Sequence, residues 1–340
     1  MRLPALSLSL PIAVSAAVFS GAVAIAAPVR TDIARPNAHV GALHATRNGV
    51  VLPYSRPLPL PALPSMSRGW LNPAAKNSSL LYVADQGAGG VWIYDQKGKN
   101  QSPIGEITQG VAGPDGLFVD HKRNLYVCNF GNGTVTVYPP GGTSPSETLT
   151  GAGSPLDVVV ALNGTVYVSN YNSNTNGTVL EYPKGQTTPS KTVVTFGTNS
   201  FPEGLAIDSS KNLYVAYNST DGEVLKFPHG SDKGTNLGIH VGYVGGLTID
   251  KSNDLDLVDQ NLPGVDVFPP GATTPSEQIK GFNLAFDDAL NHANTEIWVT
   301  QVANPPEVYG VSYPGGKILD TITSSLLSAY GVATSPDGSD

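Results

Sequence analysis

The stretch Pro114–Asn129, PDGLFVDHKRNLYVCN, decides the fold of this chain because it recurs along the sequence. It holds a short apolar segment, a polar turn and a second apolar segment that contains Leu-Tyr-Val. Residues 202–217, PEGLAIDSSKNLYVAY, repeat this order almost residue for residue. Apolar and polar residues alternate between turn residues, which predicts two antiparallel strands joined by a tight turn in each copy.

Six copies of the second segment follow one another at intervals of 44, 41, 47, 42 and 42 residues, centred on Tyr82, Tyr126, Tyr167, Tyr214, Asp256 and Trp298. A third apolar segment follows most copies and ends in an aromatic-proline pair, as at Tyr138-Pro139, and a weaker fourth segment comes after it. Repeats of about 40–50 residues with four short strands are the blades of β-propellers. The sequence therefore predicts an all-β, six-bladed propeller of four-stranded antiparallel blades.

The first repeat lacks its innermost strand, because residues 70–79 contain no Gly-Leu-x-Val-Asp element. The missing element stands at the other end of the chain, in Tyr330–Thr334. We expect this C-terminal strand to complete blade one and close the ring, which removes exposed sheet edges. Four polar residues stand where the second strands end, and we expect their side chains to bind turn backbone: Asp85, Asn129, Asn170 and Asp259.

The two quoted units resemble NHL-type propeller repeats and, more distantly, gluconolactonase-like propellers. The resemblance covers about residues 77–340 and implies the fold more strongly than a function, because propellers host many activities. The resemblance to gluconolactonase-like enzymes implies a divalent metal in this chain, held by a Glu, an Asn and an Asp on the loops that enter the innermost strands.

Composition agrees with an all-β chain. Only 14% of the 340 residues are charged, which is too few for a helical protein of this size, and 38 Gly and 28 Pro supply turns. The single cysteine, Cys128, excludes an intramolecular disulfide and is expected to be a buried thiol on a core strand.

The N-terminal residues predict export. Arg2 precedes an apolar run that ends in Ala24-Ile25-Ala26, so residues 1–26 are interpreted as a signal peptide cleaved after Ala26. The run is also long enough for a membrane anchor, which is the alternative, and no second such run exists in the sequence. The mature protein is expected to be secreted, periplasmic or on the cell surface.

Residues 27–76 are interpreted as a proline-rich basic spacer with a net charge of +5. Trp70 and Leu71 are expected to mark the point where the chain docks on the folded domain, since an aromatic side chain gains most by burial. Residues 77–340 are the predicted propeller, with 12 Lys/Arg and 26 Asp/Glu and a net charge of −14. This charge excludes a nucleic-acid partner and favours solubility, cations or cationic partners.

Ligands of propellers usually bind where the loops enter the innermost strands and surround the channel mouth. Aligning the repeats at the residue before the Gly-Leu pair assigns six residues to this mouth: Asp115, Leu156, Glu203, Gly245, Phe282 and Tyr330. By the gluconolactonase resemblance, Asp115 and Glu203 are the two candidate metal ligands, for a divalent cation such as Ca²⁺. Asn283 falls one residue out of register, so the oxygen ligands that such a cation requires are incomplete.

Catalytic residues are not predicted. His121, His229 and His292 fall in expected loops and His240 in an expected outer strand, so no histidine base reaches the mouth. No cofactor is predicted. The sequence favours a non-catalytic binding or scaffold propeller for a protein or carbohydrate partner. The alternative is a metal-dependent hydrolase of a small lactone, as the gluconolactonase resemblance implies.

Overall fold

The computed structural model describes residues 69–171 and 176–336, in which 25 β-strands and one short 3₁₀ helix occur. The predicted signal peptide and all but the last residues of the predicted spacer lie outside the described residues. No helix in the described ranges is long and apolar enough to cross a membrane.

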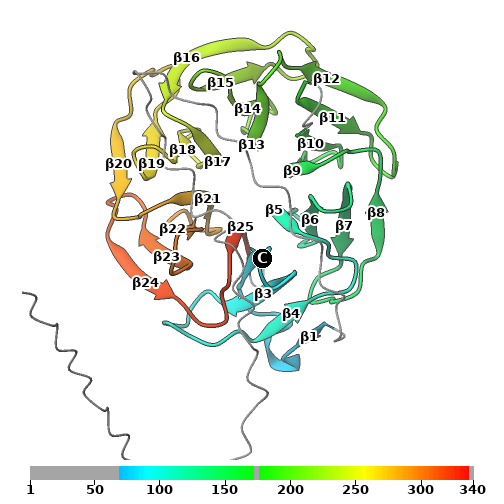
Figure 1. Cartoon of the computed structure of the whole chain (residues 1–340), viewed down its shortest axis with the longest axis vertical. Helices are drawn as coiled ribbons and strands as arrows, with labels where there is room; N and C mark the ends of the chain where they lie inside the picture. Colours follow the sequence, from blue (N-terminus) through cyan, green and yellow to red (C-terminus); the bar gives the residue numbers. More distant parts are fainter. Residues whose placement is uncertain (1–68, 172–175, 337–340) are drawn as a thin grey trace, which may run out of the picture. The chain divides into compact units, whose positions relative to one another are not determined.

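The strands form six antiparallel sheets arranged as the blades of a propeller (Figure 1). Blade one contains β1 (Trp70–Leu71), β4 (Gly105–Ile107), β3 (Gly90–Asp95), β2 (Leu80–Asp85) and β25 (Ala329–Ser335), in that spatial order, with the 3₁₀ helix η1 (Pro73–Ala75) after β1. Blade two contains β5 (Pro114–Val119), β6 (Leu125–Asn129), β7 (Thr134–Tyr138) and β8 (Glu147–Leu149). Blade three contains β9 (Pro155–Val160), β10 (Val166–Asn170), β11 (Thr178–Tyr182) and β12 (Lys191–Thr195).

The other three blades repeat the order from the innermost to the outermost strand. Blade four contains β13 (Phe201–Ile207), β14 (Leu213–Asn218), β15 (Gly222–Phe227) and β16 (Thr235–Val241). Blade five contains β17 (Val244–Ile249), β18 (Leu255–Asp259), β19 (Gly264–Phe268) and β20 (Glu277–Lys280). Blade six contains β21 (Ala285–Leu290), β22 (Glu296–Gln301), β23 (Glu307–Ser312) and β24 (Ile318–Ile322).

The C-terminal strand closes the ring, as the sequence predicted. β25 pairs with β2 in antiparallel register from Leu80 opposite Ser335 to Asp85 opposite Ala329. Leu81 and Val83 of β2 pack with Trp298 of blade six in one apolar cluster, so blades one and six share a core. The six-bladed fold with four-stranded blades is confirmed, and blade one gains β1 as a fifth, outermost strand.

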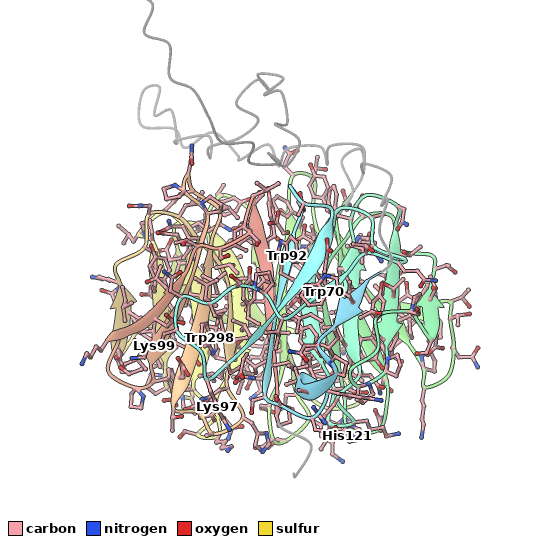
Figure 2. The ribbon with its side chains drawn as sticks, turned by 90° about the horizontal axis from the view of Figure 1, so that it is seen from below. Trp70, Trp92, Lys97, Lys99, His121 and Trp298 are labelled. Atoms are coloured by element: carbon pink, nitrogen blue, oxygen red, sulfur yellow. The ribbon has the colours of Figure 1, made fainter. Side chains whose placement is uncertain are left out.

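Strand pairing, rather than burial of the indole, fixes the segment at Trp70. Trp70 lies opposite Glu106 of β4, yet 46% of its surface is exposed, which contradicts the expectation that this aromatic docks by burial. Trp298, by contrast, is fully buried between blades six and one (Figure 2). Cys128 is fully buried on β6, as predicted.

The polar residues at the ends of the second strands organise the channel mouth. The Asp85 carboxylate accepts backbone hydrogen bonds from Ala88, Leu327 and Ser328, so it joins its own hairpin to the loop that enters β25. Asn129 and Asn170 accept from the loops that enter β5 and β9 in the same way. The predicted turn-binding role is confirmed, and it positions the start of each of these innermost strands.

Candidate functional site

The central channel is bordered by the innermost strands of the six blades: β5, β9, β13, β17, β21 and β25. Near the starts of these strands the channel narrows to a neck with a cavity of only about 20 Å³. The neck is lined by Asp115, Gly116, Leu156, Asp157, Glu203, Gly204, Gly245, Gly246, Phe286, Asp287 and Gly331. Backbones approach closely here: a Cβ added to Gly245 would lie 2.2 Å from the carbonyl oxygen of Phe286.

Four of the six residues predicted at the mouth line this neck: Asp115, Leu156, Glu203 and Gly245. Tyr330 immediately precedes the lining residue Gly331, and its ring packs edge-on against Phe286 with centroids 4.6 Å apart. The Asp115 side chain accepts a hydrogen bond of 3.2 Å from the Gln86 amide.

Phe282 does not line the neck, and Phe286 takes the position predicted for it. In blade two, Pro114 lies opposite Asn129, whereas in blade six Ala285 lies opposite Gln301, so Phe286 corresponds to Asp115. Phe282 instead packs against Tyr309 inside the blade. The prediction of Phe282 is wrong by four residues. In this repeat Asp287 and Asp288 stand where other repeats have the Gly-Leu pair, and Asn283-Leu284 resembles that pair in the sequence.

Asp157 and Asp287 are not among the residues predicted at the mouth, and they occupy a position that is glycine in the other four blades. Asp157 Oδ2 accepts a 2.7 Å hydrogen bond from the backbone N–H of Leu205 in blade four. Asp287 Oδ2 accepts a 2.9 Å bond from the N–H of Val332 in blade one. Each carboxylate therefore joins its blade to the next, and the signal in the sequence was aspartate at a recurring glycine position.

The two carboxylates carry negative charge that their surroundings compensate poorly. Burial raises the pKa of Asp157 well above its ordinary value, the Asp287 and Glu203 charges raise it further, and the N–H groups of Leu205 and Val158 partly oppose this. Burial also raises the pKa of Asp287 to about 7. A proton or another cation at this place is consequently stabilised.

Beyond the neck, the channel widens into a cavity of about 430 Å³. Its lining residues come from later positions of the innermost strands, so it lies on the far side of the neck from the strand starts. Apolar side chains such as Val119, Val160, Ile207 and Ile249 line it, and Asp157 and Asp287 line both the cavity and the neck. Lys211 is the basic residue among those that line the cavity.

The resemblance to gluconolactonase-like enzymes implies a divalent metal held by channel residues, of which Asp115 and Glu203 are the predicted carboxylate ligands. Among the residues that the structure describes, one group of three His, Cys, Asp or Glu side chains has ligand atoms within 4.8 Å of one another, and it lies on blade four: Asp221, Glu223 and His240. Asp115 and Glu203 thus gain no third converging ligand of these types from the described chain. The role of this pair as metal ligands stays a prediction.

The histidines of the described ranges do not line the channel. The residues that line the neck and the cavity include neither His121, His229 and His292 nor His240. The chemistry that the channel offers is therefore that of carboxylates set in an apolar wall. Such an arrangement can attract cationic groups by charge.

Comparison with known proteins agrees with the fold. Residues 74–159 match the family described as "SMP-30/Gluconolactonase/LRE-like region". A crystal structure of a nidogen/laminin complex contains a chain with a TM-score of 0.62 and 18% identity, the match covering 76% of this chain and 98% of that one. A luciferin-regenerating enzyme structure gives a TM-score of 0.51 and 13% identity, with coverage of 64% and 78%. A sequence comparison with curated proteins gave no match. The predicted resemblance to these propellers is confirmed, and at such identities it concerns the fold.

Proposed function

We propose that this chain is a non-catalytic binding propeller that takes a basic side chain of a partner protein into its channel cavity. One observation carries the proposal: Asp157 and Asp287, three blades apart in a ring of six, line the inner end of a cavity of about 430 Å³. That volume lies within the range of about 300–1,000 Å³ that is usual for ligand sites.

The cavity suits an aliphatic cation. Methylene groups of a lysine side chain match the valine and isoleucine walls, and its ammonium group matches the two carboxylates. Attraction between opposite charges is stronger in such a half-buried site than in water. The N–H groups of Leu205 and Val332 hold the carboxylates in place without using all their acceptor capacity.

A protein partner is favoured over a carbohydrate because many sugar hydroxyls would lose water against the valine and isoleucine walls, whereas the methylene groups of a lysine side chain match them. The net charge of −14 over residues 77–340 would speed the approach of a basic partner. The similar propeller from a nidogen/laminin complex is a precedent for a protein ligand on this fold.

The test is peptide selection on the immobilised full chain, followed by titration of the selected peptide. We expect enrichment of peptides with Lys or Arg, loss of binding when the selected lysine is acetylated, and at least tenfold weaker binding to the Asp157→Asn, Asp287→Asn double variant. Asp232→Asn removes one charge from an exposed side chain of blade four and serves as the control. Equal binding by the wild type and the double variant would refute the proposal.

The alternative, a metal-dependent hydrolase of a small lactone, is favoured by the family match over residues 74–159, which includes Asp115. It requires a divalent cation at Asp115 and Glu203, where the described residues supply two of the ligands. Lactone turnover that depends on added Ca²⁺ and disappears in Asp115→Asn and Glu203→Gln variants would establish this activity and replace the binding function.

We further propose that the protein is exported and that residues 1–26 are removed. The apolar run and the Ala-Ile-Ala sequence before the cleavage point support this. Mass spectrometry of the protein recovered from its native host tests it. A mature N-terminus at Ala27 is expected, and an intact Met1 would overturn the assignment.

A further inference from the structure

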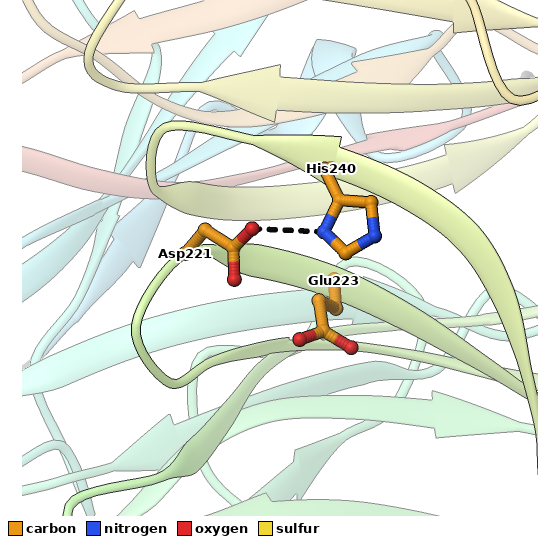
Figure 3. A group of neighbouring side chains, drawn as sticks. All are labelled: Asp221, Glu223 and His240. Carbon is orange, nitrogen blue, oxygen red and sulfur yellow. Dashed lines mark hydrogen bonds and ion pairs between the residues drawn. The ribbon is translucent and has the colours of Figure 1, made fainter.

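We propose that Asp221, Glu223 and His240 form a binding site for a divalent transition metal, of the chemical class of Zn²⁺, on blade four (Figure 3). This site is separate from the channel because β15 and β16 are the two outer strands of their blade. It does not depend on the function proposed above.

The backbone brings the three side chains together. Glu223 on β15 and His240 on β16 lie directly opposite each other in the antiparallel pair, which places their side chains on one face of the sheet. Asp221 lies in the turn just before β15, two residues before Glu223. Ligand atoms of all three residues lie within 4.8 Å of one another, and Nδ1 of His240 is 2.8 Å from Oδ2 of Asp221.

Neighbouring residues hold Glu223 in position. Its Oε2 atom accepts a 2.5 Å hydrogen bond from the Tyr217 hydroxyl and another from the Asn236 amide. The Tyr217 ring packs against Phe196 with centroids 4.8 Å apart, so this donor is itself fixed. Donors of this kind orient the ligands of metal sites.

The ligand types select the metal. One imidazole with two carboxylates suits zinc and its neighbours, whereas Ca²⁺ requires six to eight oxygens and Mg²⁺ retains most of its water. Three protein ligands leave one position of a tetrahedral zinc for water or for a side chain of another molecule. The ion would take the place between His240 and Asp221 that a proton occupies in an ordinary surface ion pair. It would also relieve the repulsion between the Asp221 and Glu223 carboxylates.

Calorimetric titration of the full chain, without a polyhistidine tag, with Zn²⁺ at pH 7.5 tests the site. We expect saturable binding of zinc at this site and at least tenfold weaker binding to His240→Ala and Glu223→Gln. Calcium and magnesium should not compete with zinc. His121→Ala, which removes an exposed histidine of blade two, is the matched control.

The Tyr217→Phe variant distinguishes zinc binding at a site with oriented ligands from zinc binding to a surface histidine alone. It retains all three ligands and removes only the hydroxyl that orients Glu223, and it should weaken zinc binding by about tenfold. Zinc binding that is the same in His240→Ala and the wild type would overturn the proposal. The absence of zinc binding by the wild type would also overturn it and leave a surface ion pair.

Discussion

Asp157 and Asp287 occupy the same position of blades three and six, and each accepts a hydrogen bond from the backbone of the following blade. The same carboxylates line the neck of the channel, where burial raises the pKa of Asp157 and the Asp287 charge raises it further. They therefore join neighbouring blades and at the same time provide the negative charge of the candidate site.

The two roles of Asp157 can be separated by substitution. Asp157→Asn keeps an oxygen that accepts from the Leu205 N–H and removes the charge, so it should unfold at a higher temperature than the wild type at pH 8. Asp157→Ala leaves that N–H without this acceptor, which costs about 1–3 kcal/mol relative to the Asn variant. Thermal unfolding followed by circular dichroism measures both effects. An Ala variant as stable as the Asn variant would contradict the role of this bond.

Asp256 should make stability depend on pH. It is fully buried, Tyr313 donates a 2.9 Å hydrogen bond to its Oδ1, and burial raises its pKa from 3.8 to about 8. The folded state thus favours the protonated form of Asp256. The stabilisation that this proton provides to the folded state is fully present below pH 3.8 and is lost as the pH rises through about 8. The gain in unfolding temperature of Asp256→Asn over the wild type should grow between pH 5 and 8 and then level off. A gain that is constant with pH would contradict this assignment.

Removal of residues 326–340 should destabilise the whole ring. The deletion removes β25, which pairs with β2 and contributes Val332 to the cluster shared with Trp298. It also exposes the edge of β2, a template for intermolecular pairing. A large fall in unfolding temperature and aggregation, seen by light scattering, are expected. A truncated protein that melts at the wild-type temperature would show that ring closure does not contribute to stability.

A side chain added at a glycine of the neck should destabilise the folded protein. A Cβ added to Gly246 would lie 2.1 Å from Asp287 Oδ1 and 3.0 Å from the Asp287 Cα, so Gly246→Ala should cost about 1–3 kcal/mol of unfolding free energy. Gly197→Ala is the matched control, because the nearest atom to its added Cβ would be 4.0 Å away. Urea denaturation compares the two variants. Equal unfolding free energies would indicate that the backbone of the neck shifts to accept the added Cβ without loss of stability.

The sequence by itself determined the number of blades, the order of strands within them and the closure of the ring by Tyr330–Thr334. These follow from period-two alternation, tight turns and a repeat of nearly constant length, which are local properties of the chain. For the same reason it located Asp115, Leu156, Glu203 and Gly245 at the neck.

Tertiary structure alone decided what depends on contacts between repeats. Only the pairing of Ala285 with Gln301 shows that Phe286 and Asp287, not Phe282, reach the neck, because the sixth repeat has two aspartates where most repeats have Gly-Leu. The Asp157–Asp287 relationship joins residues 130 positions apart, and the pairing of Glu223 with His240 depends on a strand register. The circular arrangement of blades and the pairing of their strands create these proximities, which no spacing within one repeat encodes.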